Sequence, residues 1–301
     1  MKILVTDGID KAAAEKLRAA GHEVVEQFYE TEALNEAVKG ADAIIVRSAT
    51  KIRKGTIDAA AETGQLKLII RAGVGIDNID ADYAESKGIS VRNTPMASSN
   101  AVAELALAHM LAVSRFIGVS NATMRNGEWN KNKYKGVEIS GKKLGLIGFG
   151  RIARSLAEKA KALGMTVVYT DILGDLSYDG YEYMELPDLL GAADFISLHV
   201  PYDKEKGALL GREEFATMKD GVYVINCARG GVVDEKALLE ALNSGKVAGA
   251  GIDVFEDEPS ANMELINHEN VSVTPHIGAS TKEAQKKIGM EIVSIIENGG
   301  R

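Results

Sequence analysis

Short β-branched runs alternate with helix-like segments along most of the 301 residues, and this alternation limits the fold more than any other feature. Repeated strand–helix–strand units form parallel sheets that are covered by their own helices. The segment Ala43–Val46 has no polar position, as expected of a strand buried on both faces of such a sheet. The sequence therefore predicts an α/β fold built on parallel sheets.

The predicted strands fall into two successive sets. The first set is Ile3–Thr6, Val24–Phe28, Ala43–Arg47, Leu68–Arg71 and Ser90–Arg92, with helical spacing at 11–20 and 31–39. The second set is Lys143–Ile147, Thr166–Thr170, Asp194–Val200, Val222–Cys227, Gly249–Phe255 and Val271–Thr274. Two such sets predict two doubly wound parallel-sheet domains with a cleft between them. We place the first domain at 1–95 plus 276–301 and the second at 96–275.

The remaining segments are predicted to be helical or polar. An alanine- and leucine-rich helix is expected over about 99–119, and its apolar character favours packing between domains or subunits. The polar stretch 124–141 is expected to run over the surface or over a partner. The last segment, about 280–298, is predicted to be a helix that packs back onto the first domain.

Composition excludes several classes of protein. The chain is 46% hydrophobic and 26% charged, with a net charge of −8, which disfavours nucleic-acid and acidic-membrane partners. Its one cysteine, Cys227, cannot form an internal disulfide and fits a reducing compartment. The N-terminus has no signal-peptide pattern, and the apolar segment 101–113 is shorter than the roughly 20 residues of a membrane span. We expect a cytoplasmic location and no metal site.

The second set of strands opens with a glycine-rich turn. The strand at 144–147 leads into Gly148-Phe149-Gly150-Arg151-Ile152-Ala153, a G-x-G-x-x-A pattern that precedes a helix. Gly148 permits a tight turn, Gly150 lets the backbone approach a pyrophosphate, and Ala153 lets the helix pack closely on the strand. This context predicts a dinucleotide site, although methyltransferases also use such turns.

An acidic residue strengthens the prediction of a dinucleotide site. Asp171 follows the next strand, 23 residues past Gly148, close to the spacing of a ribose-binding acid. A carboxylate there accepts hydrogen bonds from ribose hydroxyls and repels a 2′-phosphate. Because no arginine or lysine occurs at 172–174, the sequence favours NAD over NADP. The alternative is that Asp171 merely ends a strand.

Three side chains near strand ends in the second set have the chemistry of alcohol oxidation. A proton acceptor for a hydroxyl and a cation for a carboxylate are needed, and His276, Glu258 and Arg229 are the candidates. Glu256 and Asp257 compete with Glu258, and His199 is the rival base, although we expect it to line the cofactor site. Cys227 is interpreted as a small wall residue.

Four ordered motifs together resemble one family. The motifs are 148–153, Asn226–Asp234, Asp253–Pro259 and Thr274–Thr281, and they are similar to those of the D-isomer-specific 2-hydroxyacid dehydrogenases, which are Rossmann-like enzymes. The resemblance covers nearly the whole chain. Ala153 replaces a glycine that many members have.

The resemblance implies a role for each residue. His276 would be the general acid/base, Glu258 would orient its imidazole, and Arg229 would hold the substrate carboxylate. Asp253 would bind the nicotinamide carboxamide. The full set of implied NAD contacts is Gly148, Gly150, Arg151, Ile152, Asp171, His199, Val200, Pro201, Cys227, Ala228, Asp253 and Gly278.

The first set of strands supplies candidate substrate contacts. Arg47 and Arg71 follow strands, so they offer forked donors to a dianion, although ion pairs with Asp42, Asp77 or Asp80 fit their spacing equally well. The motifs at 46–50, 71–80 and 93–100 resemble those of the phosphoglycerate dehydrogenase branch of the family. On that analogy the substrate contacts are Arg47, Ser48, Arg71, Gly73, Val74, Gly75 and Asn100.

The resemblance implies NAD-dependent oxidation of a phosphorylated 2-hydroxy acid, D-3-phosphoglycerate, by a homodimer joined through its NAD-binding domains. Closure of the two domains would exclude water, and serine inhibition is not expected because no regulatory domain follows residue 301. The alternatives are another acid, such as glyoxylate, hydroxypyruvate or D-lactate, and a non-catalytic NAD-sensing interaction protein.

Overall fold

The chain divides into two compact units. The computed structural model describes residues 1–300. Unit 1 is Met1–Ser99 together with the segment that begins at Ala279, and unit 2 is Asn100–Gly278. The boundaries lie three or four residues after the predicted ones, so His276 belongs to unit 2 and not to the discontinuous first domain.

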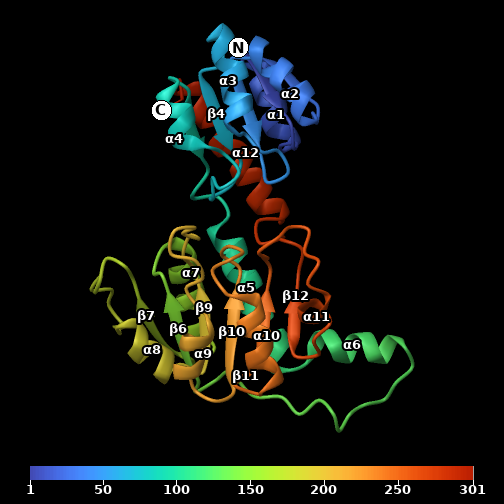
Figure 1. The fold of residues 1–301 in the computed structure, drawn as a ribbon, viewed down its shortest axis with the longest axis vertical. Helices are drawn as coiled ribbons and strands as arrows, with labels where there is room; N and C mark the ends of the chain where they lie inside the picture. Colours follow the sequence, from blue (N-terminus) through green and yellow to red (C-terminus); the bar gives the residue numbers. More distant parts are fainter. Residues whose placement is uncertain (301) are drawn as a thin grey trace. The chain divides into compact units, whose positions relative to one another are not determined.

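Unit 1, whose N-terminal part is blue to cyan in Figure 1, contains one parallel sheet. Its strand order is β2-β1-β3-β4-β5. Its strands are β1 (Lys2–Val5), β2 (Glu23–Glu26), β3 (Ala43–Val46), β4 (Leu68–Arg71) and β5 (Ser90–Asn93). Its helices are α1 (Lys11–Ala19), α2 (Thr31–Ala37), the short 3-10 helix Val38–Gly40, α3 (Lys54–Thr63), α4 (Ala81–Ser86) and α12 (Lys282–Glu297). Because β1 pairs with both β2 and β3, the winding reverses at β1, and ligands bind at the carboxyl ends of strands at such a point.

The last helix packs on the first one. Ile288, Ile292 and Ile296 of α12 are buried in a core that also contains Ile3 and Leu17. The helices approach so closely that a Cβ at position 289 would lie 2.7 Å from the Cβ of Ala13, which explains the glycine there. The prediction that the last helix returns to the first domain is confirmed.

Unit 2 contains a larger parallel sheet with the strand order β12-β11-β10-β9-β6-β7-β8 (Figure 1). Its strands are β6 (Lys143–Ile147), β7 (Thr166–Thr170), β8 (Glu182–Tyr183), β9 (Phe195–Leu198), β10 (Val222–Asn226), β11 (Val247–Ile252) and β12 (Val271–Val273). Its helices are α5 (Ser99–Ser114), α6 (Ile117–Arg125), α7 (Arg151–Ala162), α8 (Leu186–Ala192), α9 (Arg212–Thr217), α10 (Glu235–Asn243) and α11 (Met263–Ile266). The winding reverses at β6, between β7 and β9, and both predicted doubly wound sheets are therefore confirmed.

The predicted helix over 99–119 is wrong in length. Helix α5 ends at Ser114, Phe116 takes a left-handed conformation with φ 55°, and α6 leaves at a bend of 65°. The break has a tertiary cause, because the amide of Val137 donates to the Ser114 carbonyl at 2.9 Å, where a continuing helix would use its own amide.

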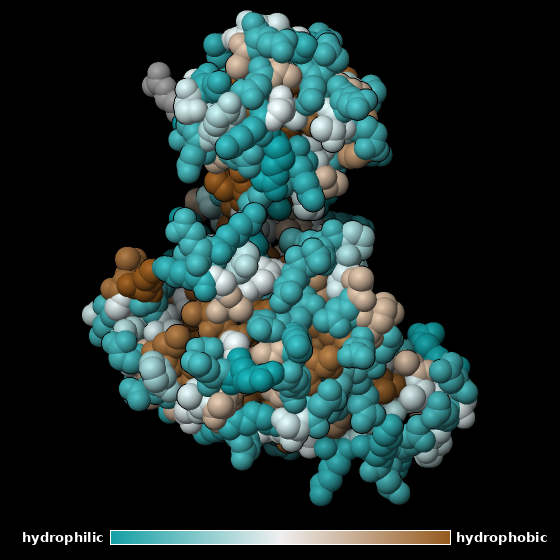
Figure 2. Space-filling model, in the orientation of Figure 1, coloured by the Kyte–Doolittle hydropathy of each residue, from teal (hydrophilic) through white to brown (hydrophobic). Residues whose placement is uncertain are grey.

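The face drawn in Figure 2 is mostly hydrophilic, with smaller hydrophobic areas. The predicted polar excursion after α6 is largely exposed, and the Trp129 side chain is 78% exposed. Within residues 1–300 no single helix has the length and apolarity to cross a membrane. Helices α5 and α6 have that length and apolarity only when they are taken together, across the bend between them.

Candidate active site

The glycine-rich turn after β6 has the geometry of a phosphate-binding turn. Gly148 has φ 83°, and a Cβ there would lie 2.7 Å from the carbonyl oxygen of His199, so only glycine fits. Gly150 caps the N-terminus of α7, and a Cβ there would meet no atom within 4 Å. The space beside Gly150 at the N-terminus of α7 is therefore open, as the approach of a pyrophosphate requires.

Asp171 lies beside this turn. Its carboxylate accepts hydrogen bonds from the amides of Phe149 at 2.8 Å and Leu173 at 3.1 Å. The following Ile172 and Leu173 side chains are exposed. The carboxylate is thus fixed at the end of β7 with acceptor capacity remaining for a ribose diol, and the residues present fit the adenosine half of NAD.

His199, Val200 and Pro201 follow β9 at the point where the winding reverses. The His199 ring lies 3.0 Å from the Ser197 hydroxyl, and burial lowers the pKa of His199 to about 4. An imidazole with that pKa is a weak base at neutral pH. His199 is therefore a poor candidate for the acid/base, while its carbonyl supports the turn at Gly148.

The loop after β10 presents Arg229. The Asn226 side chain fixes this loop, because it accepts from the Ala228 amide at 3.0 Å and donates to the Arg229 carbonyl at 2.9 Å. Burial, with the nearby Asp253 charge, raises the pKa of the Cys227 thiol, so this thiol is no nucleophile. A Cβ at Gly230 would lie 1.6 Å from the Phe255 carbonyl oxygen, which shows that this loop contacts the loop after β11.

His276 and Glu258 form a hydrogen-bonded pair. Nδ1 of His276 lies 2.8 Å from Oε2 of Glu258, and each side chain is about one third exposed, at 36% and 37%. Partial burial raises the pKa of the Glu258 carboxyl, but the His276 hydrogen bond and charge, helped by the Arg229 charge, outweigh burial and lower it. An Nδ1 held by a carboxylate leaves Nε2 as the nitrogen available for proton exchange.

The structure distinguishes Glu258 from its acidic neighbours. Glu256 is engaged with Glu235, since each carboxylate accepts from the other residue's amide, at 3.1 and 2.8 Å. Glu258 also accepts from the Phe255 amide at 3.3 Å, which holds it within the loop. Sequence spacing alone could not rank these carboxylates, because their distances from His276 along the chain are almost the same, and Glu258 was selected through the family resemblance.

Asp253 is a buried carboxylate beside His276. It is 1% exposed and accepts from the Thr274 hydroxyl and from the amides of Ile277 and Gly278, at 2.5, 2.8 and 2.9 Å. His109 of α5 extends this network to Thr274. Neither residue of this pair received a role from the sequence, because His109 lies in no motif, Thr274 was only the first residue of one, and 165 residues separate them.

The part of the chain that contains this site matches a model of one protein family. The family model for "D-isomer specific 2-hydroxyacid dehydrogenase, NAD binding domain" matches residues 107–278. The chain belongs to this family. The match spans the turn, Asp171, Arg229, Glu258 and His276, and it supports NAD as the cofactor of this dehydrogenase.

Relatives cover the whole dehydrogenase chain. A hydroxypyruvate reductase of Thermotoga maritima is 44% identical over 98% of this chain and 97% of its own length. A D-3-phosphoglycerate dehydrogenase of Methanocaldococcus jannaschii is 43% identical over 99% of this chain, which spans 57% of that protein. Among solved structures, the TT0316 protein of Thermus thermophilus has a TM-score of 0.90 at 35% identity, covering 99% of this chain and 97% of its own.

The dehydrogenase's predicted substrate residues lie mainly in unit 1, after β3 and β4. The loop that begins at Arg47 is held by Asp7, whose carboxylate accepts from the amides of Arg47 at 2.6 Å and Thr50 at 3.0 Å. Ser48 is exposed in this loop. The Arg71 guanidinium folds over position 73, where a Cβ would lie 1.4 Å from Nη1 of this flexible side chain, and the φ of 148° favours glycine there. Val74 and Gly75 follow on the same partly exposed segment.

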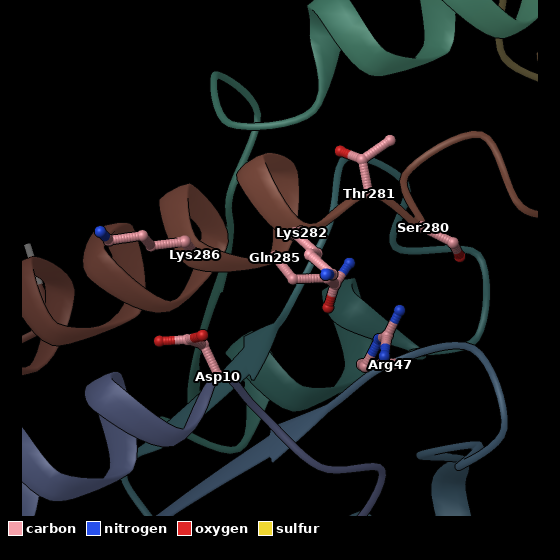
Figure 3. A pocket seen from close by; sticks show the side chains of 7 residues that line it. All are labelled: Asp10, Arg47, Ser280, Thr281, Lys282, Gln285 and Lys286. Atoms are coloured by element: carbon pink, nitrogen blue, oxygen red, sulfur yellow. The ribbon is translucent and has the colours of Figure 1, made fainter.

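Sequence spacing allowed ion pairs of Arg47 with nearby aspartates, but Asp42 and Asp80 do not form one with it. Asp80 pairs with Arg53 at 2.9 Å, and Asp42 accepts from the Lys2 amide at 2.6 Å. Arg47 instead lines a hollow of about 570 Å³ within unit 1, together with Asp10, Ser280, Thr281, Lys282, Gln285 and Lys286. In Figure 3 the Arg47, Lys282 and Gln285 side chains gather at this hollow.

Asn100 lies in unit 2 and is engaged there. Its amide oxygen accepts from Nζ of Lys159 at 2.6 Å, and its amide nitrogen donates to Glu104 at 2.6 Å. The side chain therefore links α5 to α7. A substrate contact by Asn100 would have to replace or share these bonds.

Proposed function

We propose that this dehydrogenase oxidises D-3-phosphoglycerate to 3-phosphohydroxypyruvate with NAD, the entry step of serine synthesis. The observation that carries the proposal is the hollow beside Arg47. Arg47, Lys282 and Lys286 line it, and within residues 1–300 none of these three cations has a hydrogen-bonded or ion-paired carboxylate. Asp10 offsets only part of their charge, and a phosphate dianion matches the remainder.

The residues of unit 2 would carry the chemistry. Bound NAD supplies the oxidant, which accepts the hydrogen of the alpha carbon with its electron pair. Nε2 of His276 takes the proton of the hydroxyl, and the Glu258 carboxylate stabilises the imidazolium that results. Arg229 holds the substrate carboxylate with its planar fork. The proton and the electron pair leave in separate directions, so the alcohol becomes a ketone.

A second candidate function is the reduction of hydroxypyruvate. It is favoured by the Thermotoga maritima relative of that name, which matches this chain over nearly the full length of both proteins. The acid/base chemistry is the same in reverse, with His276 donating the proton. The two candidates differ in whether the substrate tail carries a phosphate, and hence in their dependence on Arg47 and Lys282.

The first prediction separates these substrates. We expect R47A and K282A each to lower kcat/KM for D-3-phosphoglycerate by on the order of 10- to 100-fold, because a charge-assisted phosphate contact contributes about 1.5–3 kcal/mol. For unphosphorylated D-glycerate the loss should be less than threefold. R18A, which removes an exposed cation of unit 1 paired with Glu26, is the control. Equal losses on both substrates, or a wild type that prefers hydroxypyruvate, would contradict the proposal.

We further propose a cytoplasmic homodimer joined through the NAD-binding domains. Large apolar side chains on and after α5 and α6 support this proposal, since Ile117, Met124 and Trp129 are each more than half exposed in the single chain. Exposed apolar residues gathered on adjoining elements are typical of subunit interfaces. The alternative of a non-catalytic NAD sensor predicts NADH binding without turnover of any 2-hydroxy acid.

A further inference from the structure

His276 has an unfavourable backbone conformation that something must hold in place. Its φ is 53°, in the left-handed region that residues with a Cβ rarely adopt. Such a conformation persists only where neighbouring contacts determine it. The side chain of His276 is about one third exposed and bonds only to Glu258 among the contacts described above, so the restraint must come from the backbone.

The restraint comes from Asp253. The amide of His276 donates to the Asp253 carbonyl at 2.8 Å, and the next two amides, of Ile277 and Gly278, donate to the two carboxylate oxygens at 2.8 and 2.9 Å. Three successive amides of the catalytic loop thus bind one residue. The orientation of the Asp253 carboxylate therefore determines the path of the loop.

The Asp253 carboxylate is oriented in turn by Thr274, whose hydroxyl donates to Oδ1 at 2.5 Å. A hydroxyl has one proton, so the Thr274 oxygen can only accept from its other neighbour, Nε2 of His109, at 3.0 Å. Nε2 of His109 must then carry a proton.

The protonation of His109 follows from its surroundings. The residue is 2% exposed, and burial lowers the pKa of its imidazole more than the Asp253 charge raises it. A neutral imidazole with its proton on Nε2 has a bare Nδ1, which accepts from the Ser272 hydroxyl at 2.9 Å. The donors are therefore aligned in one direction, from Ser272 through His109 and Thr274 to Asp253.

Packing leaves the His109 ring little freedom. A Cβ at position 251 would lie 2.5 Å from the His109 Cβ, so α5 sits directly on β11 and depends on Gly251. With the His109 side chain 2% exposed, the ring is enclosed on the side of the helix that faces the sheet, where Ser272 and Thr274 hold it through both nitrogens. Hydrogen bonds aligned in this way polarise one another, which strengthens the last bond, to the carboxylate.

We propose that His109 is a positioning residue for the dehydrogenase reaction: through Thr274 and Asp253 it holds the backbone at 276–278, and with it the imidazole of His276, in the reactive conformation. The inference rests on the acid/base role that we propose for His276. It does not depend on which 2-hydroxy acid is the substrate.

The test is a double-mutant cycle on the full chain. Oxidation is assayed with D-3-phosphoglycerate and NAD, and reduction is assayed separately with hydroxypyruvate and NADH. H109L, which is apolar and of similar size, should lower kcat about 10-fold and increase the isotope effect of C2-deuterated substrate, while KM for the cofactor changes less than threefold. H109Q keeps an amide donor for Thr274 and should recover most of the rate. In the H276N background H109L should have no further effect on kcat, because His109 acts through His276.

A measurement on the wild type covers the case in which H109L fails to fold. With ¹⁵N-labelled histidine, the NMR spectrum should show His109 as a neutral imidazole with its proton on Nε2. A proton on Nδ1, an unchanged kcat in H109L, or an equal loss in both backgrounds would overturn the inference. If H276N itself keeps wild-type activity, the proposed acid/base role fails; if H276N is inactive and H109L is unaffected, the role of His109 alone fails.

Discussion

At the residue scale, the paired imidazole and carboxylate explain how a partly exposed loop histidine would serve as the acid/base that we propose. The Glu258 carboxylate fixes Nδ1 of His276, while Glu256 is occupied by Glu235. The sequence predicted both partners, because each follows a strand of a parallel sheet and belongs to a family motif. It could not select Glu258 over Glu256 by spacing, and it gave no sign of His109, whose partners Ser272 and Thr274 are reached only through the packing of α5 on the sheet.

A prediction at the residue scale concerns Glu258. Because the pKa of its carboxyl is lowered, Glu258 stays ionised as the pH falls below the ordinary glutamate value of 4.5, and it stabilises the imidazolium throughout the working range. E258Q removes that stabilisation. We expect kcat/KM for oxidation to fall at least about 10-fold, since misoriented acid/base groups lose much of their contribution of roughly 10²–10⁴.

The lowered pKa of the Glu258 carboxyl gives an independent measurement of the pairing. Because the His276 hydrogen bond and charge lower this pKa, it should rise in H276N, and ¹³C NMR of the labelled carboxyl measures the change. E256Q, which alters the neighbouring carboxylate, should keep wild-type kcat/KM. A Glu258 pKa that is unchanged in H276N, or lowered further, would count against the pairing.

At the element scale, strands were predicted more accurately than α5, the first helix of unit 2. The strands β4, β6 and β7 have the predicted bounds, because a buried parallel strand shows its apolar run in its own sequence. The end of α5 depends instead on Val137, which binds the Ser114 carbonyl from a segment more than 20 residues away. A helical pattern alone continues through such a break.

This explanation of the break predicts an unusual sensitivity at Gly136. A Cβ there would lie 2.1 Å from the Ser114 carbonyl oxygen and 3.1 Å from the Arg115 Cα, so G136A must displace backbone at the end of α5. We expect the free energy of unfolding to fall by about 1–3 kcal/mol, as for overpacked sites. The control is G118A in α6, where a Cβ meets nothing within 4 Å; it should be neutral or stabilising by up to about 1 kcal/mol. Urea denaturation of both variants decides, and equal effects would refute the explanation.

At the scale of the whole molecule, both sheets place candidate functional residues beyond the carboxyl ends of their strands. Asp7 and Arg47 in unit 1, and Gly148 and His199 in unit 2, lie at the point where the winding reverses. The placement at carboxyl ends was predictable, because alternating strands and helices form parallel sheets whose strands all end at one edge. The set of residues that lines the hollow beside Arg47 was not predictable from the sequence. Lys282 is distant from Arg47 in sequence and reaches the hollow only because α12 packs back on α1.

The central claim is that His276 moves the proton while the turn at Gly148 binds the cofactor independently. The most direct measurement is the activity and NADH affinity of H276N, with H22N, which changes a histidine of unit 1, as the control. We expect H276N to bind NADH within about threefold of wild type, as followed by NADH fluorescence, and to lose on the order of 10²–10⁴ in kcat. An H276N variant that turns over a 2-hydroxy acid at the wild-type rate would contradict the account.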